Sequence, residues 1–385
     1  MKKHFAAMMI SFITVLALSG CYPTGKKVNE DISSIASENT TSESTAPEST
    51  HFEYSKENLA VSFDFPEIPD ELPSRIKLKE KIFDCQKAVE LFFDGEAPVS
   101  EYLYGANEEY GQYTARDGSE LRIEGNRINY YNGEMDDPET PVSYFAVVNI
   151  CKEYRRDMYS ITGDELEDFP LQEALDSARD IISKLGITGF GEPQIYAFSL
   201  DCYEKMKQND NYIFNEEYPL TKDNEIYVFR FPQTIDEVKL SDMNVDIEDH
   251  TIEWDTLATP SSLVVGISKE GIFEFCIDAA YEMDVEILST EPIKYDFNHA
   301  IIELEKYFDK VNFTSSKSVA INKAEVLYFP VERNELNTME FVPAWSFEGY
   351  QRDLIMEETL DHVSFWDFRF IVNTDVGVVR EYSEV

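Results

Sequence analysis

Two stretches of the chain carry apolar residues at the spacing of an amphipathic helix, at every third or fourth position. The first comprises Leu171, Ala174, Leu175, Ala178, Ile181, Ile182 and Leu185. The second comprises Ala300, Ile301, Leu304, Tyr307, Phe308 and Val311. Pro170 suits the first turn of the first helix and Gly186 its C-terminal end, while Asp296 suits the N-cap of the second. The pattern therefore predicts one helix over each stretch.

Each predicted helix is followed by apolar runs that are typical of β-strands. The first helix precedes runs at 194–200, 225–231, 262–268 and 272–277, the last two joined by a turn at Lys269-Glu270-Gly271. The second precedes runs at 324–329, 341–347, 367–372 and 378–382, the last two joined by a turn at 373–377. Because the same order of elements occurs twice, we predict a duplicated unit.

The N-terminal third has a less regular pattern, which predicts a helix near 78–93 and a strand at 143–151. Short strands at 121–123 and 127–131 flank Glu124-Gly125-Asn126, a hairpin signal because glycine readily adopts a positive φ. The predicted fold class is therefore α+β. An N-terminal α+β region over 53–165 precedes two tandem units over 166–288 and 289–385, each a helix packed on an antiparallel sheet.

Two short motifs near the C-terminus carry a resemblance to known proteins. Phe341-Val342-Pro343-Ala344-Trp345-Ser346-Phe347 resembles a "vPaW" strand, and Asn373-Thr374-Asp375-Val376-Gly377 resembles the Asn-Ala-x-x-Gly turn that follows it. Both occur in extracellular accessory proteins that regulate the YycG sensor kinase of Gram-positive bacteria; Thr374 stands where Ala is usual. The helix followed by antiparallel strands is also similar to PepSY-type modules.

This resemblance covers about the last 90 residues, and the whole chain is similar to uncharacterised lipoproteins of gut clostridia. It implies that both tandem units are PepSY-like. Because the kinase regulators act by contact and PepSY modules inhibit or bind proteins, it also implies a binding role. It supplies no catalytic residues.

Residues 1–20 have the layout of a secretory signal peptide. Lys2 and Lys3 form a positive start, and the apolar run at 5–18 is shorter than the roughly 20 residues that cross a bilayer. The run ends in Leu18-Ser19-Gly20-Cys21, which resembles the lipobox of bacterial lipoproteins. The resemblance implies cleavage between Gly20 and Cys21 and lipidation of Cys21, whose two acyl chains, palmitate among them, would anchor the protein firmly. The alternative is an ordinary signal peptide with an incidental cysteine.

Residues 21–52 form the predicted lipidated linker. Between Ser33 and Thr50, ten of eighteen residues are Ser or Thr, so this stretch has little to bury and suits a flexible spacer. The expected location is therefore the extracellular face of the cell membrane, in a Gram-positive type of bacterium. The expected contact with the membrane is through the lipid anchor only.

The chain is strongly acidic, with a formal net charge of −42. Removal of residues 1–20, whose charges are Lys2 and Lys3, leaves −44 on the mature chain. Such a charge repels nucleic acid and anionic lipid surfaces, so we expect no nucleic-acid partner. It permits a basic peptide or a cation as partner, although solubility alone also explains it.

Four cysteines follow Cys21: Cys85, Cys151, Cys202 and Cys276. None has the spacing of a zinc knuckle. An exported protein could pair them in two disulfides, but their wide spacing favours buried free thiols, because cysteine packs well as a small hydrophobe. Both readings stay open at this point.

Known catalytic signatures are missing from the sequence. It has no Gly-x-Ser-x-Gly elbow, His-Glu-x-x-His helix or phosphate loop, and beyond the signal peptide only His51, His250, His299 and His362 are available near neutral pH. The many acidic residues could hide a carboxylate pair at the roughly 5–9 Å that glycosidases use, a distance that sequence does not give.

One acidic segment has the spacing of a calcium loop. Asp242, Asn244, Asp246 and Glu253 fall at the first, third, fifth and twelfth positions of an EF-hand loop. Ile247, however, stands where the sharp turn requires glycine. The segment therefore favours a solvated acidic loop over a metal site, and we expect no cofactor.

These observations favour a surface-anchored, non-catalytic module that binds a peptide or protein partner. The alternative is an extracellular, carboxylate-dependent hydrolase acting on glycan or peptide. A solute-binding lipoprotein fits less well, because such proteins alternate strand and helix throughout. An open sheet edge would favour the binding module, and a cleft with two facing carboxylates would favour the hydrolase.

Overall fold

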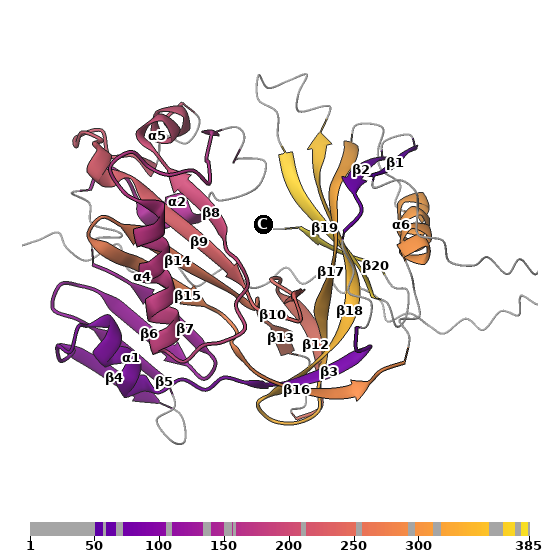
Figure 1. Cartoon of the computed structure of the whole chain (residues 1–385), viewed down its shortest axis with the longest axis horizontal. Coiled ribbons are helices and arrows are strands. Elements are labelled where there is room, and N and C mark those ends of the chain that lie inside the picture. Colours follow the sequence, from indigo (N-terminus) through magenta and orange to yellow (C-terminus); the bar gives the residue numbers. More distant parts are fainter. Residues whose placement is uncertain are drawn as a thin grey trace, which may run out of the picture. The chain divides into compact units, whose positions relative to one another are not determined.

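The computed structural model describes residues 51–56, 59–66, 72–104, 110–133, 140–149, 156, 159–208, 213–251, 256–291, 297–310, 317–353, 365–373 and 379–383. These residues belong to one compact unit, Ser49–Val385. The unit is a mixed α+β structure in which strands dominate and form two sheets (Figure 1). The predicted α+β class is confirmed at this level, while residues 1–50 lie outside the described part.

The first sheet has eight strands, in the order β4-β5-β6-β7-β15-β14-β9-β8, and every neighbouring pair is antiparallel. Its strands are β4 (Ser100–Tyr104), β5 (Tyr110–Thr114), β6 (Glu120–Glu124), β7 (Arg127–Tyr131), β8 (Gln194–Phe198), β9 (Ile226–Pro232), β14 (Ser262–Ser268) and β15 (Gly271–Ile277). The predicted hairpin at β6–β7 is confirmed, and Gly125 in its turn has φ +61°.

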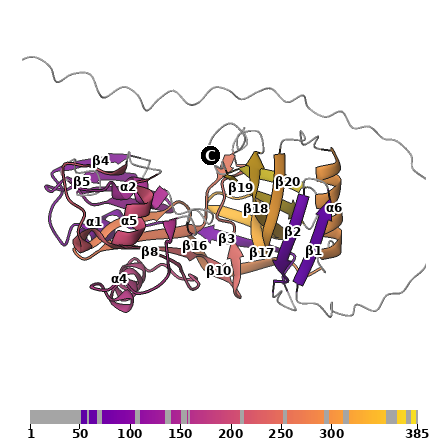
Figure 2. The same cartoon turned by 90° about the horizontal axis from the view of Figure 1, so that it is seen from above.

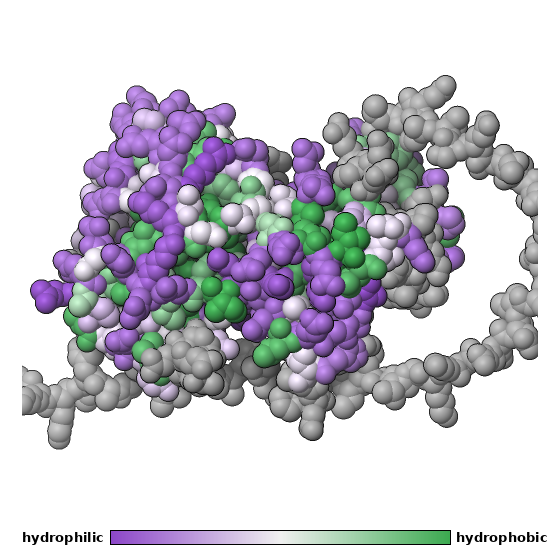
Figure 3. All heavy atoms as spheres, turned by 60° about the horizontal axis from the view of Figure 1, so that its bottom comes forward, coloured by the Kyte–Doolittle hydropathy of each residue, from purple (hydrophilic) through white to green (hydrophobic). Residues whose placement is uncertain are grey.

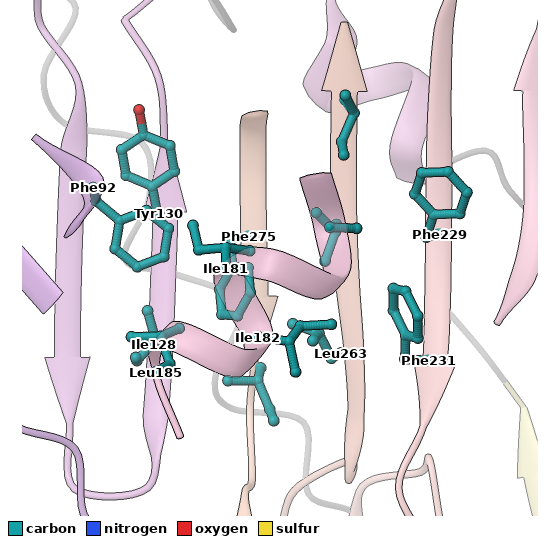
Figure 4. Close-up of a cluster of buried hydrophobic side chains, with 14 of the residues drawn as sticks. Phe92, Ile128, Tyr130, Ile181, Ile182, Leu185, Phe229, Phe231, Leu263 and Phe275 are labelled. Atoms are coloured by element: carbon teal, nitrogen blue, oxygen red, sulfur yellow. The ribbon is translucent and has the colours of Figure 1, made fainter. Parts of the chain in front are cut away.

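Helices α1 (Cys85–Phe92) and α4 (Leu171–Lys184) cover one face of this sheet. In α4 the predicted apolar stripe is buried except for Leu171, which is partly buried, and Ile181, Ile182 and Leu185 point onto the strands (Figure 4). The helix ends as predicted at Gly186, with φ +69°, where Gly186 N–H donates to Ser183 and Ile187 N–H donates to Ile182. These two bonds satisfy carbonyls that would otherwise lack partners.

The other face of the sheet is partly covered by α2 (Tyr144–Asn149) and α5 (Leu200–Met206). The prediction of a strand at 143–151 was therefore wrong. Tyr144 and Val147, three residues apart, are both buried on one side of a helical turn, and the hydroxyl of Ser143 accepts a hydrogen bond from Ala146 N–H as a cap.

The predicted helix at 78–93 is only partly confirmed. Its first residues belong to β3 (Arg75–Glu80), where Leu78 pairs with Met339 of another strand and is fully buried. The helix begins later, at Cys85, because the Asp84 side chain accepts a hydrogen bond from Lys87 N–H and so caps it.

The second sheet has twelve strands and contains both ends of the described chain. Besides β3, its strands are β1 (His51–Lys56), β2 (Leu59–Asp64), β10 (Thr234–Ile235), β11 (Val238–Leu240), β12 (Val245–Asp249), β13 (Thr256–Ala258), β16 (Tyr281–Ser289), β17 (Lys317–Arg333), β18 (Thr338–Asp353), β19 (Phe365–Asn373) and β20 (Val379–Ser383). The central order is β1-β2-β17-β18-β19-β20.

Helix α6 (Phe297–Lys310) confirms the second predicted helix and lies beside β17–β20 in both views (Figure 1, Figure 2). Its residues Ala300, Ile301 and Leu304 are buried against one face of the sheet. Trp345 and Phe347 of the predicted 341–347 strand form the core below it, and Phe297 lies edge-on to Trp345 with ring centroids 5.1 Å apart.

Three segments share one arrangement, a helix packed on a four-stranded antiparallel meander. We name them the first unit (α1, β4–β7), the second unit (α4, β8, β9, β14, β15) and the third unit (α6, β17–β20). The order predicted for the last two is present in both, and a further copy occurs in the N-terminal region. Small strands β10–β13 are inserted into the second unit and join the other sheet.

The first and second units form the eight-stranded sheet by pairing their last strands. β7 and β15 are antiparallel, with Tyr130 opposite Phe275 and Ile128 opposite Ile277. Since α1 and α4 cover the same face, an approximate twofold axis normal to the sheet relates these units. The last strand of a unit is therefore the one through which units pair in this protein.

Candidate functional site

Among the predicted site residues, Gly20, Cys21 and Glu253 lie outside the described part of the chain. Asp242 is described and pairs with Arg369, and the Asn244 side chain is exposed. Asp246 lies on β12, opposite Leu257. An extended strand separates alternate residues by about 7 Å, whereas calcium needs its oxygens around one point. In the described part, no group of three His, Cys, Asp or Glu side chains is placed to hold a metal, so the calcium assignment gains no support.

The described histidines lie on different elements. His51 Nδ1 lies 2.8 Å from the Asp64 carboxylate on the β1–β2 pair, whereas His250 Nε2 lies 3.3 Å from Glu332. His299 is exposed on α6, and His362 lies outside the described part. These positions do not suggest a shared proton-transfer site.

Three of the four cysteines are described, and all three are free thiols: Cys85, Cys202 and Cys276. Cys202 is buried, as expected of a free cysteine, and burial raises its pKa to about 12. Cys85 and Cys276 are only half-buried. Cys151 lies outside the described part.

A chain of six alternating charges lies on the third unit and the insertion beside it. In order, the side chains are Asp242, Arg369, Glu348, Lys323, Glu325 and Lys239. Arg369 Nη2 lies 2.7 Å from Glu348, Lys323 Nζ lies 2.9 Å from Glu348 and 3.4 Å from Glu325, and Lys239 Nζ lies 2.8 Å from Glu325. The Arg369–Glu348 contact is an ion pair whose angle does not make a hydrogen bond.

Burial gives these charges perturbed pKa values. For Asp242, burial is the largest effect and raises the pKa, but Arg369, Arg230 and Lys323 together outweigh it, and the pKa is lowered. For Glu348, burial outweighs Arg369 and Lys323, and the pKa is raised. Because three acidic and three basic groups alternate, the charges compensate one another. We interpret this network as structural, since a ligand would have to displace an ion pair to bind.

A second polar group, on the half-covered face of the eight-stranded sheet, is not compensated. Glu274 of β15 is 6% exposed, and its Oε2 has no hydrogen-bond partner in the described part. Burial raises the pKa of Glu274 to about 7, an effect that its contact with Cys276 only partly offsets. Burial also raises the pKa of Asp278, four residues further on. Asp278 follows the end of β15 and is exposed, so the two carboxyl groups do not form one buried pair.

The outer edge of β20 is a different kind of candidate. β20 pairs with β19 on one side, with Ile371 opposite Arg380 and Phe370 opposite Glu381. No other described strand pairs with its second side. In the first and second units, the equivalent side of the last strand is occupied by the β7–β15 pairing. An open edge presents backbone N–H and C=O groups to a further strand.

Exposed apolar side chains are spread over the surface. The large ones among the described residues are Ile82, Val99, Tyr102, Phe145, Ile287, Leu288, Ile302 and Leu336, which belong to several different elements. Figure 3 shows hydrophobic surface in separate areas between hydrophilic ones on one face. The sheet edge is therefore a better-defined candidate than an apolar patch. None of the described helices is long and apolar enough to cross a membrane.

No protein-family model and no curated protein matches the sequence. Among solved structures, the chain is similar to the crystal structure of an uncharacterized protein from Eubacterium rectale ATCC 33656, with a TM-score of 0.57 and 14% sequence identity. The similarity covers 87% of this chain and 94% of that chain. At this identity the likeness shows a common fold, and it leaves function to be argued from the site.

Proposed function

We propose that the protein is an exported lipoprotein, anchored through Cys21, whose folded body binds an extended segment of a protein or peptide partner. The anchor is supported by the apolar run, the Leu18-Ser19-Gly20-Cys21 lipobox and the Ser/Thr-rich linker. The binding role is supported by one observation above all, the open edge of β20 in the third unit.

The first two units supply the physical precedent for binding at this edge. Four residue pairs join β7 to β15, from Glu274 opposite Tyr131 to Ile277 opposite Ile128. β20 occupies the equivalent place in its own meander and has five residues. An extended segment laid along β20 would form the same backbone hydrogen bonds, which is how peptides add to sheet edges elsewhere. The PepSY-like character of the units, which we keep as part of the proposal, agrees with action by contact.

Charge favours a basic partner segment. The mature chain carries a net charge of −44, so basic segments approach it faster and acidic ones are repelled. Backbone pairing would then supply register, and side-chain pockets would supply selectivity.

Two proline variants of β20 test the proposal. Adjacent residues of a strand direct their N–H groups to opposite edges, so Arg380→Pro and Glu381→Pro differ in which edge loses a donor. The full chain is expressed on live cells, crosslinked, purified and analysed by mass spectrometry. We expect one proline variant to lose the partner with an unchanged melting temperature, because its outward N–H is gone. The other should melt at a lower temperature, because it breaks the β19–β20 ladder.

Cys21→Ala is the control for the anchor, since an unanchored chain should lose a membrane-bound or wall-bound partner. Capture of the same partner by both folded proline variants would exclude β20 as the binding edge. Absence of any enriched partner with the anchored wild type would overturn the binding role and direct attention to hydrolase assays on glycans and peptides.

A further inference from the structure

Three reactive side chains meet on the face of the eight-stranded sheet that α1 and α4 leave uncovered. Glu274 and Cys276 are alternate residues of β15, and Tyr131 of β7 is registered opposite Glu274. The Cys276 Sγ atom lies 3.2 Å from the Tyr131 hydroxyl oxygen and 3.5 Å from Glu274 Oε1. Strand geometry explains the meeting, because alternate residues share a face and registered residues are neighbours.

Together, these three side chains have more hydrogen-bond acceptor lone pairs than hydrogen atoms to donate to them. The Cys276 thiol has one hydrogen, which it can donate either to Tyr131 or to Glu274. Glu274 is 6% exposed, and its second oxygen, Oε2, has no hydrogen-bond partner among the described residues. Buried carboxylate oxygens normally have partners, so this arrangement is suited to a group that accepts lone pairs.

The charged side chains that act on Cys276 and Tyr131 are both acidic. Besides burial, Glu274 and Asp278 are the charged groups that raise the pKa of Cys276, and both also raise that of Tyr131. Arg127 is a counter-charge to Asp278. Cys276 and Tyr131 are half-buried, and Glu274 between them is buried.

We propose that Glu274, Cys276 and Tyr131 bind one borderline-soft divalent cation of the zinc class, independently of the partner proposed for β20. The ligands would be the Cys276 thiolate, a Glu274 carboxylate oxygen and the Tyr131 phenol oxygen, with a fourth position for water. Zinc binds sulfur at about 2.3 Å and oxygen at about 2.0 Å, so tetrahedral ligands of these kinds lie about 3.5 Å apart. The Sγ–Oε1 separation is 3.5 Å.

Tyr131 is necessary to this proposal because no three His, Cys, Asp or Glu side chains of the described part surround one point. When the cation binds, a metal–sulfur bond replaces the thiol S–H bond, and the proton passes to solvent. The thiolate selects against hard cations such as calcium and magnesium, which prefer oxygen.

Cadmium is the probe for this site, because its thiolate complexes have a sulfur-to-metal charge-transfer band in the ultraviolet. The protein is the full chain carrying Cys21→Ala, which removes the thiol of the linker. We expect a charge-transfer band that saturates at one equivalent of cadmium and is displaced by zinc. Cys276→Ser should abolish the band, while Glu274→Gln and Tyr131→Phe should weaken binding at least about tenfold.

Cys85→Ser is the matched control. Cys85 is also half-buried and hydrogen-bonded to a tyrosine, Tyr113, but it lies on α1, which covers the other face of the sheet. Its removal should leave the band unchanged. Circular dichroism verifies that each variant is folded, and Tyr131→Phe, which keeps the ring, is the mildest change. The absence of a band in the wild type, or its persistence in Cys276→Ser, would overturn the proposal.

Discussion

The side-chain amide of Gln233 hydrogen-bonds both backbone groups of Tyr281. Gln233 Nε2 donates to the Tyr281 carbonyl at 2.8 Å, and the Tyr281 N–H donates to Gln233 Oε1 at 3.1 Å. Gln233 is fully buried and also donates to the Thr188 carbonyl, while Ser261 donates to its Oε1. The amide therefore acts as a short piece of strand, satisfying the backbone where β9 ends and β16 begins.

Replacement of Gln233 should be costly. Gln233→Leu keeps the volume but leaves the backbone groups of Tyr281 and the Thr188 carbonyl buried without partners, each at about 1–3 kcal/mol. We expect the free energy of unfolding in urea to fall by about 3 kcal/mol or more. Gln112→Leu, at an exposed position of β5, should change it by less than about 0.5 kcal/mol. An equal effect of the two substitutions would show that the amide network is unimportant.

For the charge network, we predict that replacing a buried arginine lowers the stability much more than replacing an exposed one. The Arg369 side chain is 16% exposed and contacts Asp242 and Glu348. Arg369→Met should lower the free energy of unfolding by about 3–5 kcal/mol, because it leaves buried carboxylates uncompensated. Arg179→Met removes an exposed ion pair with Glu192 and should cost less than about 1 kcal/mol. Chemical denaturation of both variants decides whether the network is structural.

From the raised pKa of Glu274, we predict that the folded protein loses stability as the pH rises. Burial raises the pKa of its carboxyl from 4.5 to about 7, so the folded state favours the protonated form. This contribution is complete below pH 4.5 and is lost as the pH rises through 7, by about 3 kcal/mol in total. We therefore expect the free energy of unfolding of the wild type, relative to Glu274→Gln, to decrease between pH 5 and pH 8 in metal-free buffer.

The control for this titration is Glu270→Gln. Glu270 is exposed in the turn between β14 and β15, just before the strand that contains Glu274. It should keep the pH dependence of the wild type. A difference between wild type and Glu274→Gln that is constant with pH would contradict a perturbed carboxyl.

From the close approach of Gly349 to the neighbouring strand, we predict that this position of β18 requires glycine. A Cβ atom at this position would overlap the carbonyl oxygen of Ala320 on β17, beside the register shift between Ile321 and Lys323. Gly349→Ala should therefore lower the melting temperature markedly, since backbone must move to accept it. At Gly95 the space around a Cβ atom is open, so Gly95→Ala should lower the free energy of unfolding only through the positive φ of +77°, by about 1 kcal/mol. A smaller effect at Gly349 than at Gly95 would contradict the close approach.

Several elements could be predicted because their signals are local. The apolar stripe of α4 and the glycine at its end lie within sixteen residues, and both ends of the helix agree with the prediction. The apolar runs that predicted β14 and β15 likewise lie within single strands. The prediction at 143–151 was wrong because Val147 and Val148 favour strand locally, while the Ser143 cap and the packing of Tyr144 favour helix.

The candidate sites could not be predicted, because their residues are distant in sequence. Tyr131 and Cys276 are 145 positions apart, and Arg369 and Asp242 are 127 apart. With 75 acidic residues in the chain, sequence offers no way to choose Glu274 from the rest. Its burial and its missing hydrogen-bond partner are properties of the folded sheet alone.

By itself, the sequence determined the α+β class, the two long helices and most strands of the last two units, because periodicity and end signals act over a few residues. The signal-like start, the resemblance of Leu18-Ser19-Gly20-Cys21 to a lipobox and the acidic charge are also apparent without a fold. Only the tertiary structure decided that the N-terminal region holds a further helix–meander unit, that β7 pairs with β15, and that no other described strand pairs with the second side of β20. Strand pairing joins residues far apart along the chain, and its choice depends on the burial of whole faces rather than on any local pattern.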